Sequence, residues 1–179
     1  MCVWLHTAHL EPDYVVASGG PLSGMLHVGR YPSGVDDILT HVGADLSGAQ
    51  FLAPVVPDVM RWKYAKLLDN AGNALEAVTG RIESDERISL ARRAFAEGAA
   101  VLEAAGIEYA SRAEQAERRG DLVRHLPVDG ERRGGGSSWQ SLERRTGSIE
   151  ADYLNGEFVL LGRLHGVPTP VNEVLHGPG

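Results

Sequence analysis

The chain has 179 residues, of which 43% are hydrophobic and 23% are charged, and its formal net charge is -7. A composition of this kind excludes an intrinsically disordered chain, and the length is enough for one buried core or for one domain with part of another. The acidic balance argues against a nucleic-acid partner, because phosphate binding relies on clustered lysine and arginine side chains.

The first 31 residues show a strand-like pattern. Short apolar runs at residues 3–5, 14–17 and 25–28 are separated by segments rich in Pro, Gly and Asp, which are typical of turns. Three short strands cannot cover an apolar face without a second layer. This region is therefore predicted to be the end of a larger sheet-containing domain.

After this region the pattern becomes mainly helical. A short helix is expected over residues 36–46 and a strand over 51–56. A long helix is expected over 58–79, and Pro57 and Asp58 suit its first turn.

The rest of the chain is predicted to be helical apart from one loop. That loop covers residues 127–136, because its three consecutive glycines would lose too much backbone entropy in a helix or strand. The helices are predicted at residues 85–105, 110–119, 138–144 and 152–165, with a last turn at 171–175.

One face of the long predicted helix is polar. At about 100° per residue, Lys66, Asn70 and Asn73 fall on one side of this helix and the apolar residues on the other. Such a stripe is most often a solvated surface. Asparagine lowers helix propensity, however, so two asparagines beside a lysine also fit the wall of a polar cleft, with one cationic donor and two amides.

Two further positions could bind an anion or a polar ligand. The junction that ends at Ser138 offers backbone N–H groups at a predicted helix start, where a carboxylate or phosphate is favoured, although a plain serine N-cap is the commoner case. Glu150 likewise is more often a charge at a helix start than a ligand-binding group. The histidines have no metal-site spacing, and no metal site is predicted.

The sequence also bears on the location of the protein. Residues 1–6 do not resemble a signal peptide, and the apolar runs are far shorter than the roughly 20 residues that a bilayer requires. The single cysteine, Cys2, excludes an internal disulfide and fits a reducing compartment. We therefore expect a cytoplasmic protein with no membrane partner.

Two parts of the sequence resemble the ketopantoate reductase family. Residues 61–75 resemble its Trp-x-Lys-Leu-x-x-Asn-x-x-(x)-Asn-x-Leu helix. Residues 137–145, 150–156 and 165–172 are similar, in this order, to its Ser-Ser-Met-x-Gln-Asp, Glu-Ile-Asp-Tyr-Leu-Asn-Gly and His-Gly-x-x-x-Pro-x-Asn blocks. The resemblance covers most of the chain from about Val55 onward.

The resemblance implies a fold and a domain division. Residues 1–46 would be a remnant, the last strands, of a dinucleotide-binding domain, and residues 47–179 the helical substrate-binding and catalytic domain. The expected fold class is mainly α, a helical domain of the 6-phosphogluconate-dehydrogenase-like type preceded by strands from a truncated Rossmann domain. The glycine-rich turn that holds NADPH in the family would lie upstream of Met1.

The activity that the resemblance implies is NADPH-dependent 2-dehydropantoate 2-reductase, which makes pantoate for pantothenate and coenzyme A synthesis. Hydride addition to the ketone builds negative charge on its oxygen, and Lys66 would be the cationic acid that meets it. Asn70 and Asn73 would hold the hydroxyl and carbonyl of the substrate. Ser138 would hold its carboxylate, and Glu150 would meet the ribose or amide side of the cofactor.

Several alternatives stay open at this point. Asn70 and Asn73 are three residues apart where some family members have four, and Gly135 stands where many have asparagine, so the substrate could be a related 2-keto acid. The expected partners are this small molecule and a Rossmann domain in cis or in trans, without which the chain would be inactive. Homodimerisation is compatible with the resemblance. The alternative from another class is a non-catalytic helical fragment or dimerisation module.

Overall fold

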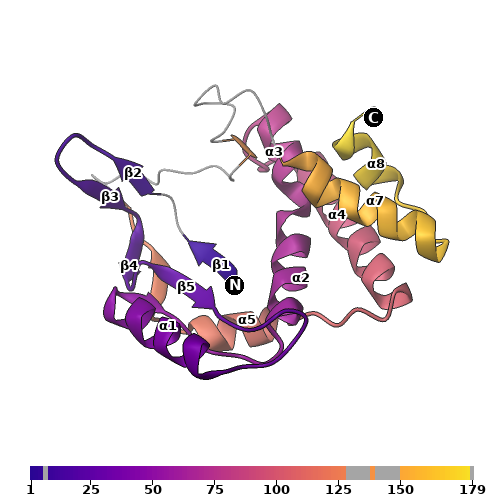
Figure 1. Cartoon of the computed structure of the whole chain (residues 1–179). Coiled ribbons are helices and arrows are strands. Elements are labelled where there is room, and N and C mark those ends of the chain that lie inside the picture. Colours follow the sequence, from indigo (N-terminus) through magenta and orange to yellow (C-terminus); the bar gives the residue numbers. More distant parts are fainter. Residues whose placement is uncertain (6–7, 128–137, 140–149, 178–179) are drawn as a thin grey trace. The chain divides into compact units, whose positions relative to one another are not determined.

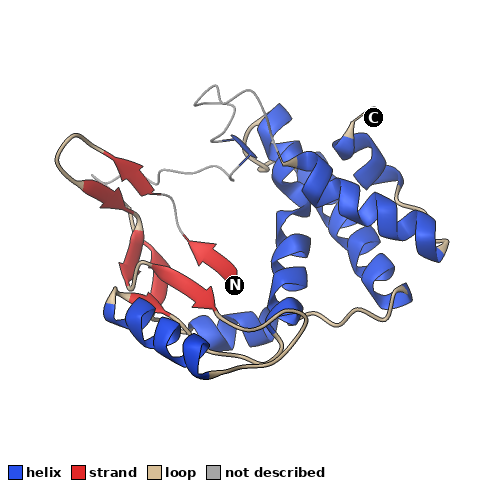
Figure 2. Ribbon diagram, viewed as in Figure 1, coloured by secondary structure: helices blue, strands red, loops and turns tan. Residues whose placement is uncertain are grey.

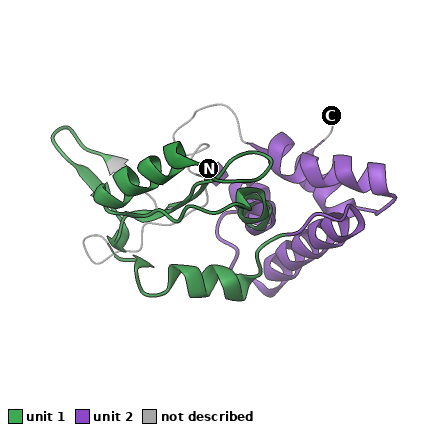
Figure 3. Ribbon diagram, turned by 60° about the horizontal axis from the view of Figure 1, so that its bottom comes forward, with its two compact units in different colours: residues 1–66, 109–134 green, residues 67–108, 135–179 purple. Residues whose placement is uncertain are grey.

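The computed structural model describes residues 1–5, 8–127, 138–139 and 150–177. The chain forms two compact units, drawn in green and purple in Figure 3. Unit 1 comprises residues 1–66 and 109–134, and unit 2 comprises residues 67–108 and 135–179. The predicted division at residue 46, which concerns the origin of the two parts, stays a prediction.

The strands of unit 1 are short (Figures 1 and 2). They are β1 (Cys2–Leu5), β2 (Ala8–Leu10), β3 (Val15–Ala17), β4 (Gly19–Pro21), β5 (Gly24–His27), β6 (Phe51–Leu52) and β7 (Val123–His125). One sheet has the order β1-β5-β6, in which β5 is antiparallel to β1 and parallel to β6. The other two pairs, β2 with β3 and β4 with β7, are antiparallel. Every residue of β5 is buried, as expected for the middle strand of this sheet.

The strands differ in part from those predicted. β1, β3 and β5 confirm the three strands expected in the first 31 residues. Residues 19–21, predicted as a turn, pair as β4 with β7, and neither β7 nor β2 was predicted. The strand expected over 51–56 is formed only in part: β6 covers two residues, and the pairing resumes as an isolated parallel bridge between Val28 and Val55. Pro54, between these two stretches, has no N–H to donate.

Helix α1 (Asp37–Gly48) confirms the helix expected near residues 36–46. Its N-cap is Asp36, whose carboxylate accepts a hydrogen bond from the backbone N–H of Leu39 at 2.9 Å. This N–H, together with the guanidinium of Arg30, holds the pKa of Asp36 below its ordinary value. The start of α1 is therefore fixed by an ionised cap.

Helix α5 (Arg112–Arg119) confirms the helix expected near residues 110–119. It begins with a capping box: Ser111 accepts a hydrogen bond from the N–H of Glu114, and the carboxylate of Glu114 accepts one from the N–H of Ser111. The same carboxylate binds Arg61 in two contacts of 2.7 and 2.9 Å. The cap thus also ties α5 to the helix that carries Arg61.

The long helix expected over residues 58–79 is helical throughout but changes type near its middle. It consists of α2 (Val59–Asp69), the 3₁₀ turn η1 (Asn70–Gly72) and α3 (Asn73–Thr79). A 3₁₀ segment inside a longer helix often marks a functional or strained position. Here it coincides with two of the predicted site residues.

Unit 2 is helical, and the fold of the chain is mainly α as predicted. Its helices include α4 (Asp85–Ala104), α7 (Ala151–His165) and α8 (Pro170–His176), which match the expected helices closely. Of the helix expected over 138–144, only Ser138 and Trp139 are described, and both are helical. Most of the predicted loop at 127–136 lies outside the described residues. No helix in the described part of the chain is long and apolar enough to span a membrane.

The core of unit 2 depends on one small residue, Gly98 of α4. A Cβ atom at this position would lie 2.9 Å from Phe158 and 3.0 Å from Leu68, both of which are buried. Two large side chains therefore occupy the space that any other residue would need.

Gly98→Ala should lower the free energy of unfolding of unit 2 by about 1–3 kcal/mol, because the added methyl group overpacks this contact. Gly48→Ala, in α1, is the control, since no atom lies within 4 Å of its added Cβ. Urea unfolding of both variants measures the difference. Equal stabilities would contradict this account of the core.

Candidate functional site

Lys66 lies near the end of α2, in unit 1. Its side chain is half-buried, and its amine donates a hydrogen bond to the carbonyl of Val3 in β1. Lys63, one turn earlier and exposed, donates to the carbonyl of Met1 at 3.4 Å. The two lysines therefore bind the same end of the chain but differ in burial.

The position of α2 in unit 1 is set by Trp62, which is only 5% exposed. The imidazole of His27 in β5 stacks on its indole, with ring centroids 3.9 Å apart and planes inclined by 16°. The thiol of Cys2 donates to the backbone carbonyl of Trp62 at 3.3 Å, and burial raises the pKa of this thiol. On the α5 side, the N–H of Ala110 donates to the carbonyl of Arg61.

His27 is held as a neutral imidazole. Burial, and after it the charge of Arg118, lowers its pKa to about 4 from the usual 6.5. Nε2 of His27 and Nε1 of Trp62 are buried and have no hydrogen-bond partner within the described part of the chain. The stack thus combines strong apolar packing with two unsatisfied polar atoms, which is uncommon in a folded core.

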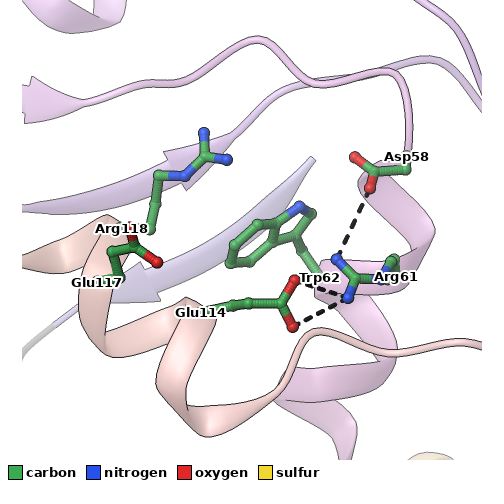
Figure 4. A pocket seen from close by; sticks show the side chains of 6 residues that line it. All are labelled: Asp58, Arg61, Trp62, Glu114, Glu117 and Arg118. Atoms are coloured by element: carbon green, nitrogen blue, oxygen red, sulfur yellow. Dashed lines mark hydrogen bonds and ion pairs between the residues drawn. The ribbon is translucent and has the colours of Figure 1, made fainter.

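A pocket of about 470 Å³ opens beside Trp62 in unit 1 (Figure 4). Glu114 in this pocket is paired with Arg61, and its pKa is lowered to about 2 by the N–H of Ser111 and by Arg61. Much of the charge in the pocket is therefore compensated internally, and none of the five predicted site residues lines it. Its lining consists of Asp58, Arg61, Trp62, Glu114, Glu117 and Arg118.

Sequence reasoning gave no sign of this pocket. It is formed where the first turn of α2 meets α5, and the two segments are about 50 residues apart in the sequence. The capping signal around Ser111 and Glu114 was the one local pattern that could have pointed to it. Since Arg61 is bound to both Glu114 and Asp58, we regard the pocket as part of the support of α2.

Asn70 and Asn73 lie in unit 2, at the first residue of η1 and the first residue of α3. Both side chains are partly exposed. The N–H of Asn73 donates to the carbonyl of Asn70, the i to i+3 bond of a 3₁₀ turn. Residues three apart are eclipsed in such a turn, so the two side chains leave the backbone in nearly the same direction.

Ser138 and Glu150 also belong to unit 2. Ser138 is 4% exposed and lies in a helical stretch with Trp139. Glu150 is exposed and is the N-cap residue of α7, but its side chain makes no capping hydrogen bond. Asn70 and Asn73 thus lie on one helical turn, as residues three apart do, and the convergence of the five residues on one substrate stays a prediction.

The residues that sequence reasoning missed form a buried polar chain in unit 2. Asn155 of α7 and Asn172 of α8 are both fully buried and are hydrogen-bonded to each other. Glu97 of α4 accepts hydrogen bonds from the side chain and the N–H of Asn172. Both asparagines lie in the blocks at residues 150–156 and 165–172 that resemble the family. This resemblance could have pointed to them, but the sequence analysis gives them no role.

Comparison with known proteins decides the family. The family model for the C-terminal domain of ketopantoate reductase, PanE/ApbA, matches residues 58–177. The chain belongs to the ketopantoate reductase family. The helical domain is therefore of the ketopantoate reductase type, as predicted, and the family consists of oxidoreductases.

Solved structures agree with this assignment. A PanE/ApbA family ketopantoate reductase from Ralstonia eutropha JMP134 is 25% identical with a TM-score of 0.68, and the match covers 97% of this chain and 55% of that one. D-Mandelate dehydrogenase in complex with NADH has 21% identity, a TM-score of 0.70 and coverages of 97% and 57%. A dimeric ketopantoate reductase from Staphylococcus aureus has 17% identity, a TM-score of 0.63 and coverages of 98% and 57%. The chain spans about half the length of these proteins.

The lowered pKa of His27 predicts acid sensitivity of unit 1. Because the folded state resists protonation down to about pH 4, the unfolded state takes up a proton first as the pH falls below 6.5. The free energy of unfolding should therefore decrease between these values, by on the order of 2 kcal/mol at pH 4.5.

His27→Phe is the matched variant, since it keeps an aromatic ring on Trp62 but cannot titrate. Urea unfolding at pH 7 and pH 4.5 should show a smaller loss for this variant than for the unaltered chain. Identical losses in the two proteins would show that His27 does not carry the pH dependence.

Proposed function

We propose that this chain is the substrate-binding and catalytic part of an NADPH-dependent 2-dehydropantoate 2-reductase. The observation that carries the proposal is the placement of Lys66 at the end of a helix that resembles the family motif. Its side chain is half-buried, and its amine is hydrogen-bonded to a main-chain carbonyl. The pathway would be that of pantothenate and coenzyme A. The single buried cysteine supports a cytoplasmic location.

The chemistry requires a cation at the ketone oxygen. As hydride arrives at the carbonyl carbon, charge develops on the oxygen, and an ammonium group can stabilise it and then donate a proton. The bond to Val3 fixes where the amine of Lys66 lies, which is a requirement for such an acid. Asn70 and Asn73 would bind the hydroxyl and carbonyl of the substrate, and Ser138 its carboxylate.

NADPH would supply the hydride when bound. Among the residues of this chain, Glu150 fits a contact with its ribose or amide, because an exposed carboxylate that is not used as a helix cap can accept hydrogen bonds from hydroxyl or amide groups. No glycine-rich dinucleotide motif occurs in the sequence. Turnover would therefore require a Rossmann domain, in cis or in trans, and the chain alone should be inactive.

A second candidate is reduction of a related 2-keto acid. Two observations favour it: the fold is shared with D-mandelate dehydrogenase, and Gly135 stands where many ketopantoate reductases have asparagine. A homodimer is also part of the proposal. It is supported by Tyr153, Leu160 and Leu164, which are 82%, 53% and 68% exposed on one face of α7.

The decisive experiment replaces Lys66 in a protein in which the chain follows a nucleotide-binding domain. Lys66→Ala should lower kcat with 2-dehydropantoate by about 10²-fold or more, because the developing charge loses its cation. Lys63→Ala is the matched control, a lysine one turn away that is also bonded to a carbonyl but is exposed. NADPH oxidation measured at 340 nm follows both. Equal rates for the two variants would remove Lys66 from the proposed role.

Substitutions of the proposed substrate contacts and of the proposed cofactor contact should raise different Michaelis constants. Asn70→Ala and Ser138→Ala should raise KM for the keto acid by about tenfold while leaving KM for NADPH nearly unchanged. Glu150→Gln should instead raise KM for NADPH and leave KM for the keto acid nearly unchanged. Comparing 2-dehydropantoate with an aromatic 2-keto acid in the same assays tests the second candidate. A uniform effect of all three substitutions on both constants would contradict the assigned contacts.

A further inference from the structure

Asn155 connects α7 to the 3₁₀ turn in the helix of the predicted site residues. Its side chain is fully buried, and its Nδ2 donates to the carbonyl of Ala71, inside η1, at 3.0 Å. The same nitrogen donates to Oδ1 of Asn172 at 2.9 Å. All three residues belong to unit 2.

The orientation of the Asn155 amide is fixed by its neighbours. Nδ2 of Asn172 donates to the carbonyl of Ala94 at 3.0 Å and to the carboxylate of Glu97 at 2.9 Å. Both partners are acceptors, so Oδ1 of Asn172 must face Asn155, which can meet it only with its N–H₂ group. The chain of hydrogen bonds therefore directs the donor of Asn155 toward Ala71.

This arrangement leaves Oδ1 of Asn155 buried without a partner among the described residues. An unpaired buried carbonyl costs free energy, and an apolar residue of the same shape, such as leucine, would avoid that cost. The hydrogen bond that Nδ2 donates to Ala71 is therefore the feature that asparagine supplies here and leucine cannot. A side chain that inserts at a helix carbonyl is a recognised cause of a local break in the i to i+4 ladder.

We propose that Asn155 is a positioning residue that holds the 3₁₀ turn at Ala71 and thereby aligns Asn70 with Asn73. In a regular α-helix, residues three apart are rotated by about 60° from each other, whereas in a 3₁₀ turn they are eclipsed. The turn thus lets two amides at this spacing reach the same ligand. The inference rests on the proposed function, in which both amides bind the keto acid.

The test uses Asn155→Leu, which has nearly the same shape but no donor. Val159→Ala is the control, one turn later on the same helix and also buried, because the valine side chain has no polar atom that could join the hydrogen-bond chain. In this chain, Asn155→Leu should speed up hydrogen exchange of the backbone amides of residues 73–76 about tenfold more than exchange of the amides of α4. Val159→Ala should change the exchange rates of both regions alike. With a nucleotide-binding domain present, Asn155→Leu should raise KM for the keto acid about tenfold and change kcat much less.

The two measurements separate the inference from the proposed function. Unchanged exchange at residues 73–76, or an increase matched by the control, would overturn the role of Asn155. The role of Asn155 would also be overturned if Asn155→Leu speeds up exchange at residues 73–76 but leaves KM for the keto acid unaltered in an active protein. If the unsubstituted protein with its nucleotide-binding domain does not reduce 2-keto acids, the proposed function fails, and the exchange data alone still decide whether Asn155 holds the turn.

Discussion

The packing of Trp62 against His27 is the constraint on which unit 1 depends. An indole buries more apolar surface than almost any other side chain. Here the ring stacked on it, the imidazole of His27, comes from the central strand of the sheet. This contact fixes the rotation of α2 about its axis. Lys66 follows one turn later, so its direction toward β1 is a consequence of where Trp62 is buried.

In unit 2, a chain of polar contacts connects three helices. The carboxylate of Glu97 accepts hydrogen bonds from the first N–H groups of α8 and from the side-chain amide of Asn172. Oδ1 of Asn172 in turn accepts a hydrogen bond from Nδ2 of Asn155. Charge-assisted bonds of this kind are directional, unlike apolar contacts. They can therefore specify a turn geometry that apolar packing around Gly98 would leave undetermined.

The elements that local sequence determines were predictable, and those that distant residues determine were not. The caps of α1 and α5 and the amphipathic pattern of α4 and α7 depend on residues within a few positions of each other. β4, by contrast, exists because residues 19–21 pair with a strand more than 100 residues later. The 3₁₀ turn was missed for the same reason, since its side-chain donor, Asn155, lies 84 positions away.

The candidate site divides in the same way. The polar stripe of Lys66, Asn70 and Asn73 could be read from helical periodicity, but its preference over a solvated surface came from family motifs and not from the spacing itself. What periodicity could not supply was the alignment of the two amides. An α-helical wheel places the two amides on one side of the helix but about 60° apart, whereas residues three apart are eclipsed in a 3₁₀ turn.

The unsatisfied polar atoms give these observations a common physical basis. Within the described residues, the buried side-chain atoms without a partner are Nε2 of His27, Nε1 of Trp62 and Oδ1 of Asn155. Two of them belong to the stack that orients α2, and the third belongs to the side chain that holds η1. Folded proteins tolerate such costs mainly where a requirement other than stability fixes the residue. Trp62 lies on the segment that carries Lys66, Asn70 and Asn73, His27 stacks on Trp62, and Asn155 donates to the carbonyl of Ala71 in the same segment. All three unpaired atoms therefore belong to side chains that lie on this segment or contact it, and the cost of leaving them unpaired supports the role proposed for it.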